Sequence, residues 1–554
     1  MQDEGGGERW RVRGVSFSLR QKRAGVFRCP AFLLIVLGIL LSGTAVLSAT
    51  EVATHKSTGS DPAKSSATLL RYLKIPGHMS EDKSAFHSLG EPRDAFAARI
   101  FLVDNARKSI EVQYYIYEDD QTGDFFSYHL LKAAERGVKV RILLDDLITS
   151  GKDVELKMMA SHPNIELKLF NPNRLRRSFR NLALLFNVNS LGKRMHNKAL
   201  IVDGAAAIVG GRNIGDVYYA ADNETLFFDY DILATGKIVS DICGEFELYW
   251  KSKEAISSKE LLEGSYTDAQ YKQEKSALLM RSGEFGRSQI GRAIADSDFA
   301  KDVRHRRVEM TVAKRAELYY DYPEKVASDE QNTSTHISAQ IGAHLGQADQ
   351  KILIISPYFI PSDTLMQYIR DVRAKGVEVT VITNSLASTD VFPVYSGYRW
   401  FIEDLLKAGV RLYELKPQSF ATITRSRKWL KSHRTSLHTK MIVIDNDLLV
   451  VGSANLDPRS NKLNTELILV IDSPSMVKEK WSLVRKLLSE ENFYRLSWER
   501  YPSSFEEDGI PSFGPVWHTT EKGEKRVYYA PPHSGFWRTL GTDLLSFLPI
   551  EGYL

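Results

Sequence analysis

Cysteine and net charge are the two properties that this sequence of 554 residues has little of. It contains two cysteines, Cys29 and Cys243, which excludes a disulfide framework and a zinc site built from thiolates. The 73 basic and 69 acidic side chains leave a net charge of only +4, so no global positive field would hold nucleic acid by releasing counterions. Catalytic chemistry must therefore use other residue types, and any site for an anion must be local.

The amino terminus joins a basic flank to an uncharged segment. Residues 1–28 are rich in arginine, and no residue in the following stretch, 29–50, is charged. This arrangement is typical of a signal peptide and also of a membrane anchor, and the sequence does not decide between the two. In both cases the basic flank stays in the cytoplasm and the rest of the chain is exported. Residues 51–90 show no periodic apolar face and are predicted to be a linker.

An internal repeat dominates the rest of the chain. The segment HNKALIVDGAAAIVGGRNIGD from His196 matches HTKMIVIDNDLLVVGSANLDP from His438 at a constant offset of 242 positions (438 − 196). The identical positions, together with one further downstream glutamate pair, are His196/His438, Lys198/Lys440, Asp203/Asp445, Gly210/Gly452, Asn213/Asn455 and Glu224/Glu466. One register over so many positions predicts that a whole domain is duplicated.

The periodicity around each copy predicts the domain organisation. Helix, strand, helix and strand alternate over 95–108, 110–117, 124–136 and 138–144, and a similar order recurs over 352–360, 363–374 and 377–382. We therefore expect an α/β fold made of two tandem domains, at 91–255 and 310–495. Residues 256–309 are predicted to be an inter-domain linker and 496–554 a carboxy-terminal tail. The apolar runs after each histidine place the repeated motif on a β-hairpin.

Each copy presents an imidazole beside an ammonium group. Side chains alternate along an extended segment, so His196 and Lys198 point the same way, as do His438 and Lys440. The lysine would repel a metal cation, whereas the pair suits an anion such as phosphate. If the two halves faced each other, one histidine could attack phosphorus while the other protonated the leaving alcohol. The duplication thus predicts a site shared between the halves, with no metal and no cofactor.

Further polar residues of the motif are expected to support this chemistry. Asn213 and Asn455 offer amide donors and Ser453 a hydroxyl, so we predict that these three bind substrate. Glu224 and Glu466 fall where a carboxylate could fold back behind the imidazole and fix its tautomer.

Asp203 and Asp445 complete the repeated motif and are included with its catalytic residues. An aspartate that follows a strand is also a natural turn residue, so a structural role is the expectation for this pair.

The complete pattern resembles a known family. His-x-Lys, four residues, Asp, six residues and Gly-Gly/Ser-x-Asn is similar to the motif of the phospholipase D superfamily, and it occurs in both halves. GGRNIGDVYY, the stretch TNSLASTDVFPVYSGYRWFIEDLLKAGVRLYELK and the closing LPIEGYL resemble the class C type of bacterial cardiolipin synthases. The resemblance covers roughly residues 70–554. The long basic amino terminus is not part of the family pattern.

The resemblance implies an active site on a pseudo-twofold axis and phosphatidyl transfer without a metal. It implies that His196 takes the phosphatidyl group and that His438 protonates the leaving head group, although the two roles could be exchanged. Lys198, Lys440 and the two asparagines would hold the phosphate oxygens. A hydroxyl of phosphatidylglycerol would then form cardiolipin, with phosphatidylethanolamine as a second candidate donor.

Two stretches upstream of the motifs, 173–186 and 425–434, mix arginine or lysine with tryptophan, phenylalanine or leucine. This composition suits a segment at a membrane surface with anionic head groups, and also a solvated loop with a small packing cluster. The tail at 536–548 is expected to cap the core. The chain is therefore predicted to work at the inner membrane, with the catalytic part on its non-cytoplasmic side.

Two other functions stay open from the residues alone. A hydrolytic phospholipase D or another phosphodiesterase, including a nuclease, would use the same phosphohistidine and discharge it with water. The near-neutral charge and the lipid-like stretches speak against nucleic acid as a partner. A catalytically silent lipid-binding scaffold is the third possibility, and two complete motifs argue against it.

Overall fold

The computed structural model describes residues 69–76, 79–146, 153–172, 192–222, 225–261, 267–326, 336–418, 434–502, 504, 511–535, 538–539 and 542. All of them belong to one compact unit, Asp61–Leu554. Several predicted features lie outside the described residues: the amino-terminal segment 1–50, the stretch 173–186, Glu224, residues 425–433 and most of 536–548. Within the described ranges, no helix combines the length and the apolar character that crossing a membrane requires.

Two large β-sheets organise the described residues. The nine-stranded first sheet has the order β10 (Ala255–Ser257), β5 (Ile165–Phe170), β4 (Lys139–Asp145), β3 (Ser109–Tyr114), β6 (Ala199–Val202), β7 (Ala206–Gly210), β9 (Asp231–Gly236), β2 (Ser84–Leu89) and β12 (Thr311–Val312). The ten-stranded second sheet has the order β13 (Arg315–Tyr320), β20 (Leu467–Asp472), β19 (Leu448–Gly452), β18 (Met441–Ile444), β14 (Lys351–Ile355), β15 (Glu378–Asn384), β16 (Arg411–Leu415), β21 (Phe493–Arg500), β22 (Phe513–Glu521) and β23 (Glu524–Tyr528).

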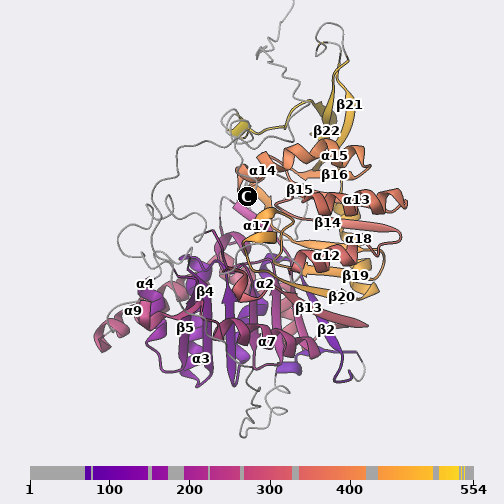
Figure 1. Cartoon of the computed structure of the whole chain (residues 1–554). Coiled ribbons are helices and arrows are strands. Elements are labelled where there is room, and N and C mark those ends of the chain that lie inside the picture. Colours follow the sequence, from indigo (N-terminus) through magenta and orange to yellow (C-terminus); the bar gives the residue numbers. More distant parts are fainter. Residues whose placement is uncertain are drawn as a thin grey trace, which may run out of the picture. The chain divides into compact units, whose positions relative to one another are not determined.

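The two sheets share one strand plan. The order β5-β4-β3-β6-β7-β9-β2 of the first sheet corresponds to β16-β15-β14-β18-β19-β20-β13 of the second. In each, the central strand pairs in parallel with one neighbour and antiparallel with the strand that follows the motif histidine. The duplication read from the motifs therefore extends over whole domains, and the predicted tandem α/β architecture is confirmed (Figure 1).

Helices cover the sheets on both sides. The outer layer of the first domain contains α2 (Pro92–Asn105), α3 (Gln121–Glu135), α4 (Asp153–Ala160), α8 (Ser258–Leu261), α9 (Asp268–Arg287), α10 (Gln289–Ala295) and α11 (Asp298–Arg304). That of the second contains α12 (Ile337–Leu345), α13 (Asp363–Ala374), α14 (Phe392–Tyr398) and α15 (Ile402–Lys407), and α17 (Pro458–Lys462) follows the second motif. Between the sheets, α7 (Lys237–Lys251) and α18 (Pro474–Leu487) share one apolar core with strands of both domains.

Local sequence explains where several of these elements begin. Asp120 starts α3 because its carboxylate accepts a hydrogen bond from the Gly123 amide at 2.9 Å, and the Ser362 hydroxyl serves Leu365 in the same way at α13. Strand β4 carries the aliphatic run Ile142–Leu144 at its centre because both of its faces are covered there, as parallel strands require.

The predicted linker at 51–90 ends too late. Residues 84–89 form β2, which pairs along its whole length with β9 and occupies the place that β13 has in the second sheet. Its sequence, SAFHSL, interrupts the apolar positions with serine and histidine, so it lacks the run that marks the central strands. The first domain therefore begins before residue 91.

The predicted linker at 256–309 and the tail at 496–554 also contain ordered structure. Helices α9 to α11 fill the former and bury Leu278, Phe285 and Phe299 in the core of the first domain. Only three residues of α9 are buried, so its apolar periodicity is weak in the sequence. Strands β21 to β23 continue the second sheet beyond residue 495, because β21 pairs antiparallel with β16.

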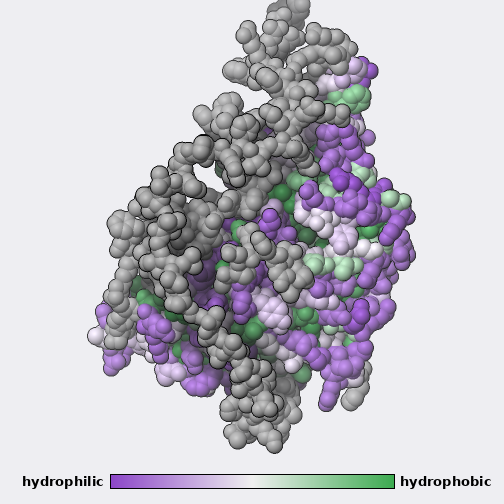
Figure 2. Space-filling model, in the orientation of Figure 1, coloured by the Kyte–Doolittle hydropathy of each residue, from purple (hydrophilic) through white to green (hydrophobic). Residues whose placement is uncertain are grey.

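Two short pairs of strands lie outside the large sheets. Strand β1 (Leu73–Lys74) pairs with β11 (Val308–Glu309), and β8 (Thr225–Phe228) pairs in parallel with β17 (Arg434–Leu437). The second pair joins the two domains directly in front of the second motif. A cavity of about 420 Å³ lies behind this junction, with a mainly apolar lining contributed by both domains that includes Phe228, Leu437 and Val484. The described part of the surface seen in Figure 2 is mostly hydrophilic, with small hydrophobic patches.

Candidate active site

The repeated motif forms an antiparallel hairpin in each domain, as predicted. Strand β6 pairs with β7 and β18 pairs with β19, and each histidine lies just before the first strand of its hairpin. The motif glycine sits where the next strand passes very close. A Cβ atom on Gly210 would lie 2.6 Å from the Asp231 Cα, and one on Gly452 would lie 2.1 Å from the Leu467 carbonyl oxygen. Both sites therefore require glycine for steric reasons.

The imidazole of each repeated motif is held by a carboxylate of the opposite domain. His196 Nδ1 lies 2.8 Å from Glu466 Oε2, and His438 Nδ1 lies 2.6 Å from Asp229 Oδ2. All four side chains are buried. An Nδ1–H that donates to a carboxylate leaves the lone pair on Nε2, which is the form needed for attack on phosphorus. Neither domain alone assembles a histidine with its orienting carboxylate.

Asp229 is the carboxylate that orients His438, a role that the constant offset of 242 between the two repeats had given to Glu224. The pairing of β7 with β9 sets Gly210 opposite Asp231, and that of β19 with β20 sets Gly452 opposite Ile468. Beyond the hairpins the offset between the domains is therefore 237 (468 − 231), and the counterpart of Glu466 is Asp229. The first domain has five more residues between motif and carboxylate, so a constant offset of 242 selected the wrong acidic residue. Glu224 itself lies outside the described residues.

The backbone around each histidine is also fixed by the other domain. The His196 amide donates to the Thr465 carbonyl at 2.9 Å, and the His438 amide donates to the Phe228 carbonyl at 2.8 Å. Thr465 directly precedes Glu466, and Phe228 directly precedes Asp229. Each histidine is therefore bonded through its backbone and its side chain to two consecutive residues of the opposite domain. Any shift between the domains would disturb both sites.

Aromatic rings pack against the imidazoles of both histidines. The ring of Tyr115 meets His196 edge to face, with centroids 5.0 Å apart. Phe227 stacks on His438 at 5.1 Å, and Tyr218 meets the same imidazole edge to face at 5.3 Å. These aromatic residues were not predicted. Tyr115 directly follows β3, Tyr218 ends the short 3₁₀ turn at Asp216–Tyr218, and Phe227 lies in the four-residue strand β8, and the sequence alone carries no distinguishing pattern at these places.

Burial sets the protonation of the histidines. It lowers the pKa of His196 to about 4, with the nearby Lys198 charge acting in the same direction and Glu466 opposing. The pKa of His438 is lowered as well, first by burial and then by Lys440. Burial alone would raise the pKa of Glu466 and of Asp229, but the histidines bonded to them lower both overall. His196 is therefore neutral near pH 7, and its carboxylate partner is ionised.

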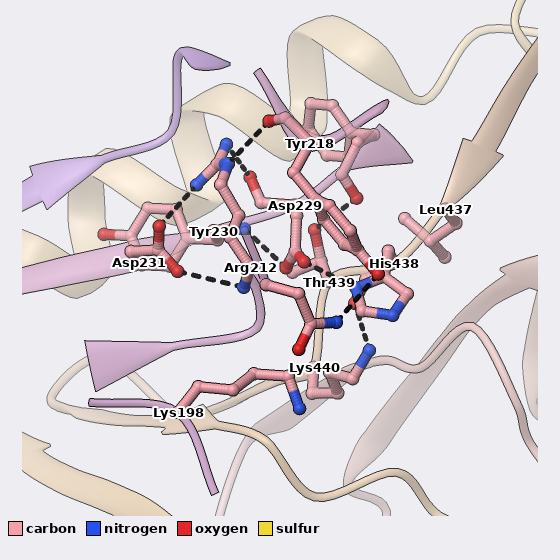
Figure 3. A network of polar contacts seen from close by, with 12 residues as sticks. Lys198, Arg212, Tyr218, Asp229, Tyr230, Asp231, Leu437, His438, Thr439 and Lys440 are labelled. Atoms are coloured by element: carbon pink, nitrogen blue, oxygen red, sulfur yellow. Dashed lines mark hydrogen bonds and ion pairs between the residues drawn. The ribbon is translucent and has the colours of Figure 1, made fainter. Parts of the chain in front are cut away.

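The two motif lysines lie in the same buried space (Figure 3). Lys198 Nζ donates to the His196 carbonyl, and Lys440 Nζ donates to the His438 carbonyl, both at 2.6 Å. Burial lowers the pKa of Lys198 to about 7 and that of Lys440 to about 8, and the charge of Lys440 adds to the shift of Lys198. An anion placed between them would restore both charges, which makes this space suited to a phosphate group.

The three residues predicted to bind substrate have different surroundings. Ser453 Oγ donates to Glu466 Oε2 at 2.5 Å, so it supports the orienting carboxylate instead. Asn213 is fully buried, accepts from the Ile116 amide at 3.1 Å and donates to the Tyr218 hydroxyl at 2.8 Å. Among the described residues, the amide oxygen of Asn455 is buried without a hydrogen-bond partner. The Asn213 N–H group is committed to Tyr218, whereas no described residue accepts a hydrogen bond from Asn455 Nδ2, so Asn455 is the asparagine that can donate to a phosphate oxygen.

Asp203 and Asp445 are structural residues far from the reaction. They lie at the other end of β6 and β18 from the histidines, in turns with φ of 55° and 53°. The Asp203 carboxylate accepts from the amides of residues 107–109 at 2.7 to 3.1 Å. Asp445 accepts from those of residues 349–351 at 2.7 to 2.9 Å. Both fix the loop that enters the central strand, which agrees with the structural role expected for this pair and not with a catalytic one.

One acidic cluster of the described residues has the spacing of a metal site. Oxygen atoms of Asp119, Asp124 and Glu155 lie within 4.8 Å of one another in the outer layer of the first domain. Arg281 already supplies positive charge there, with Nε 2.6 Å from an Asp124 oxygen. The cluster shares no residue with the histidine site, so a metal bound there would not contact the two imidazoles.

Comparison with known proteins agrees with this geometry. The family model described as "Cardiolipin synthase, PLD-like domain" matches residues 100–250 and 341–487, one match in each domain. The chain is 34% identical over 496 residues to cardiolipin synthase C of Escherichia coli, a match that covers 89% of this chain and 100% of that protein. It is 26% identical to the major cardiolipin synthase of Bacillus subtilis, covering 77% of this chain and 74% of that one.

A solved phosphatidylserine synthase from Haemophilus influenzae is similar with a TM-score of 0.49 and 15% identity, over 78% of this chain and 92% of that one. The family match covers more than half of the chain and includes both copies of the repeated motif. The chain therefore belongs to the cardiolipin synthase family of enzymes with duplicated phospholipase D-like domains.

Proposed function

We propose that this enzyme makes cardiolipin by transferring a phosphatidyl group from a donor phospholipid to phosphatidylglycerol. His196 Nε2 attacks the donor phosphorus, the bond to the head-group oxygen breaks, and His438 delivers the proton that the leaving alcohol needs. His438 then removes the proton from a hydroxyl of phosphatidylglycerol. That oxygen attacks the phosphohistidine, the nitrogen–phosphorus bond breaks and His196 is regenerated.

The crossed pairing of histidines and carboxylates carries this proposal. It supplies two imidazoles with the same tautomer in one buried space, which a double displacement needs and a single imidazole could not provide. The low pKa of His196 supports its assignment as the nucleophile, because a neutral imidazole keeps its lone pair near pH 7. Lys198, Lys440 and Asn455 are placed to stabilise charge on the non-bridging phosphate oxygens.

The relatives support the choice of substrate. Cardiolipin synthase C of Escherichia coli is similar over its full length, and the similarity therefore includes the parts of the chain that surround the catalytic motifs. Phosphatidylglycerol as acceptor and phosphatidylglycerol or phosphatidylethanolamine as donor are the substrates that we assign by analogy.

The membrane location is a proposal from the sequence. The uncharged stretch at 29–50 follows a strongly basic flank, which favours insertion with the flank in the cytoplasm. The catalytic domains would then work on the non-cytoplasmic side of the inner membrane. Fusing a reporter enzyme that is active only outside the cytoplasm to the carboxy terminus would test this, and an inactive reporter in cells that contain the full-length fusion would contradict it.

The function is tested with mixed micelles of labelled phosphatidylglycerol, with and without phosphatidylethanolamine, and products read by mass spectrometry. Labelled cardiolipin is expected, and a requirement for phosphatidylethanolamine would identify it as the donor. Phosphatidic acid as the sole product would instead show a hydrolase. The reaction is expected to survive thorough chelation, and its loss on chelation with recovery on adding a divalent cation would refute the metal-independent mechanism.

A further inference from the structure

A row of polar residues leads away from His438 along β17. Side chains alternate in an extended strand, and Leu437 lines the cavity between the domains, whereas Ser436 is bonded to Asp390 and Arg434 to the Thr389 carbonyl. Arg434 and Ser436 therefore share the opposite face with His438. At about 3.3 Å of rise per residue, Ser436 lies about 7 Å and Arg434 about 13 Å from His438 along the strand.

A carboxylate stands at the middle of this row. Asp390 accepts a hydrogen bond from the Tyr358 hydroxyl at 2.6 Å and another from Ser436 Oγ at 3.3 Å. The residue is exposed, so the carboxylate keeps room for a further donor. Its negative charge contributes an upward shift to the pKa of Tyr218, and it partly opposes the lowering of the pKa of His438 and Lys440 by burial. Asp390 therefore belongs to the surroundings of the histidine site.

Two guanidinium groups converge at the far end of the row. Arg434 and Arg538 both donate to the carbonyl oxygen of Thr389, and Arg538 also donates to that of Leu386 at 2.9 Å. Burial lowers the pKa of both arginines, the charge of Arg538 adds to the shift of Arg434, and the Asp390 charge acts on both in the opposite direction. Within the described part of the chain neither arginine has a carboxylate at ion-pair distance. Two cations held together in this way favour an anion beside them.

We propose that Asp390, Arg434 and Arg538 form an acceptor subsite that binds the glycerol head group of the acceptor lipid together with the phosphodiester that this glycerol already carries. The inference rests on the proposed transfer function and assigns the part of the acceptor that each residue binds. Asp390 accepts a hydrogen bond from the free central hydroxyl of the acceptor glycerol. Arg434 and Arg538 bind the phosphodiester at the other end of that glycerol, while its terminal hydroxyl faces His438.

The order of these groups matches the chemistry of the acceptor. A three-carbon glycerol carries the reacting hydroxyl at one end, a free hydroxyl in the middle and the second phosphate at the other end. The row presents a base, a carboxylate and a pair of guanidinium groups in the same sequence. Water and simple alcohols lack the last two groups, so the subsite would favour transfer to phosphatidylglycerol over hydrolysis.

The full-length enzyme in mixed micelles provides the test, with ethanol and phosphatidylglycerol offered as competing acceptors. The ratio of cardiolipin to phosphatidylethanol is measured by mass spectrometry. Arg434→Gln is expected to lower this ratio at least tenfold and Asp390→Asn several-fold, because ethanol needs neither residue. Arg373→Gln is the matched control. Arg373 also donates to backbone carbonyls of the second domain, but from the end of α13 to Val377 and Ala408, which precede β15 and β16 at their amino-terminal ends.

A soluble acceptor separates this subsite from membrane binding. Glycerol 1-phosphate is expected to accept the phosphatidyl group at least tenfold faster than glycerol in the wild-type enzyme, and Arg434→Gln is expected to remove the preference. Equal losses for ethanol and phosphatidylglycerol in Arg434→Gln would overturn the subsite, and so would an unchanged ratio. A wild-type enzyme that makes phosphatidylethanol but no cardiolipin would refute the proposed function itself.

Discussion

The two domains keep the same catalytic groups and support them with different chemistry. In the first, Asp231 lies between Arg99 and Arg212 at 3.0 and 3.1 Å, and all three side chains are fully buried. The corresponding positions of Asp231 and Arg212 in the second domain are Ile468 and Ala454, which are apolar. A charged network and an aliphatic core therefore serve the same strand pairing.

The support of the carboxylates differs in a correlated way. Gly211 leaves space for Asp229, because a Cβ there would lie 2.2 Å from an Asp229 oxygen. Its counterpart Ser453 places a hydroxyl against Glu466, which receives a second hydroxyl bond from Ser460 at 2.7 Å. The two pairs, Gly211 with Asp229 and Ser453 with Glu466, are alternative solutions to holding the opposite histidine.

This comparison teaches that the duplication conserved the reacting groups and left the supporting positions free to diverge. The divergence also makes the two imidazoles unequal, since one is walled by Tyr115 and the other by Phe227 and Tyr218. Unequal surroundings allow one histidine to act as nucleophile and the other as acid, although both stand in the same motif.

Removing either imidazole should give the largest effect. His196→Ala and His438→Ala are each expected to lower the rate of transfer by about 10⁴-fold or more, because neither domain can replace the group lost from the other. Steady-state cardiolipin formation and trapping of the phosphoenzyme after acid quench would be measured. Phosphoenzyme in His438→Ala but not in His196→Ala identifies His196 as the nucleophile, and the reverse pattern would exchange the roles. A near-normal rate in either variant would contradict the two-histidine mechanism.

The orienting carboxylates should come next. Glu466→Gln and Asp229→Asn each present an amide that can stabilise the wrong histidine tautomer, and a loss of about 10³ to 10⁴-fold in kcat is expected with little change in KM. Glu245→Gln serves as the matched control. Glu245 is also buried and accepts hydrogen bonds, from Gln113 and Asn197, but it touches neither imidazole. If Glu224→Gln were as damaging as Asp229→Asn, the crossed pairing deduced from strand register would be wrong.

The contrasting cores can be tested through stability. Asp231→Asn leaves two buried guanidinium groups without a counter-charge and should cost about 3–5 kcal/mol. Ile468→Val, at the corresponding position, should cost about 0.5–1.5 kcal/mol, as expected for one methyl group in an aliphatic core. Urea unfolding followed by circular dichroism measures both. Equal costs would show that the Arg99–Asp231–Arg212 network adds nothing beyond packing.

The sequence predicted most of this site because the catalytic groups repeat at a fixed spacing. His196, Lys198, His438, Lys440 and Glu466 could all be selected from the motif. Asp229 could not, since its equivalence to Glu466 depends on strand pairing across an insertion of five residues. Ser453 and Asn213 were given to the substrate because the sequence shows that they can donate and does not show which protein groups they meet. Strand β2 was missed for a similar reason: its burial is decided by the neighbouring strand β9.

The smallest expected effect is in the pH dependence of kcat/KM, which should show that His196 acts in its neutral form and His438 in its protonated form. With a pKa of about 4, His196 keeps its lone pair above that value, so the rate should fall about tenfold per pH unit below pH 4. On the alkaline side, the rate falls first as His438, whose pKa is below the ordinary value, loses its proton. It falls further as Lys198, near pH 7, and Lys440, near pH 8, lose their charges. A profile over pH 3 to 9 measures this, and Lys198→Gln should remove the step near pH 7. An acid limb centred near pH 6.5 would mean that burial does not shift His196, and the assignment of the nucleophile would lose its electrostatic support.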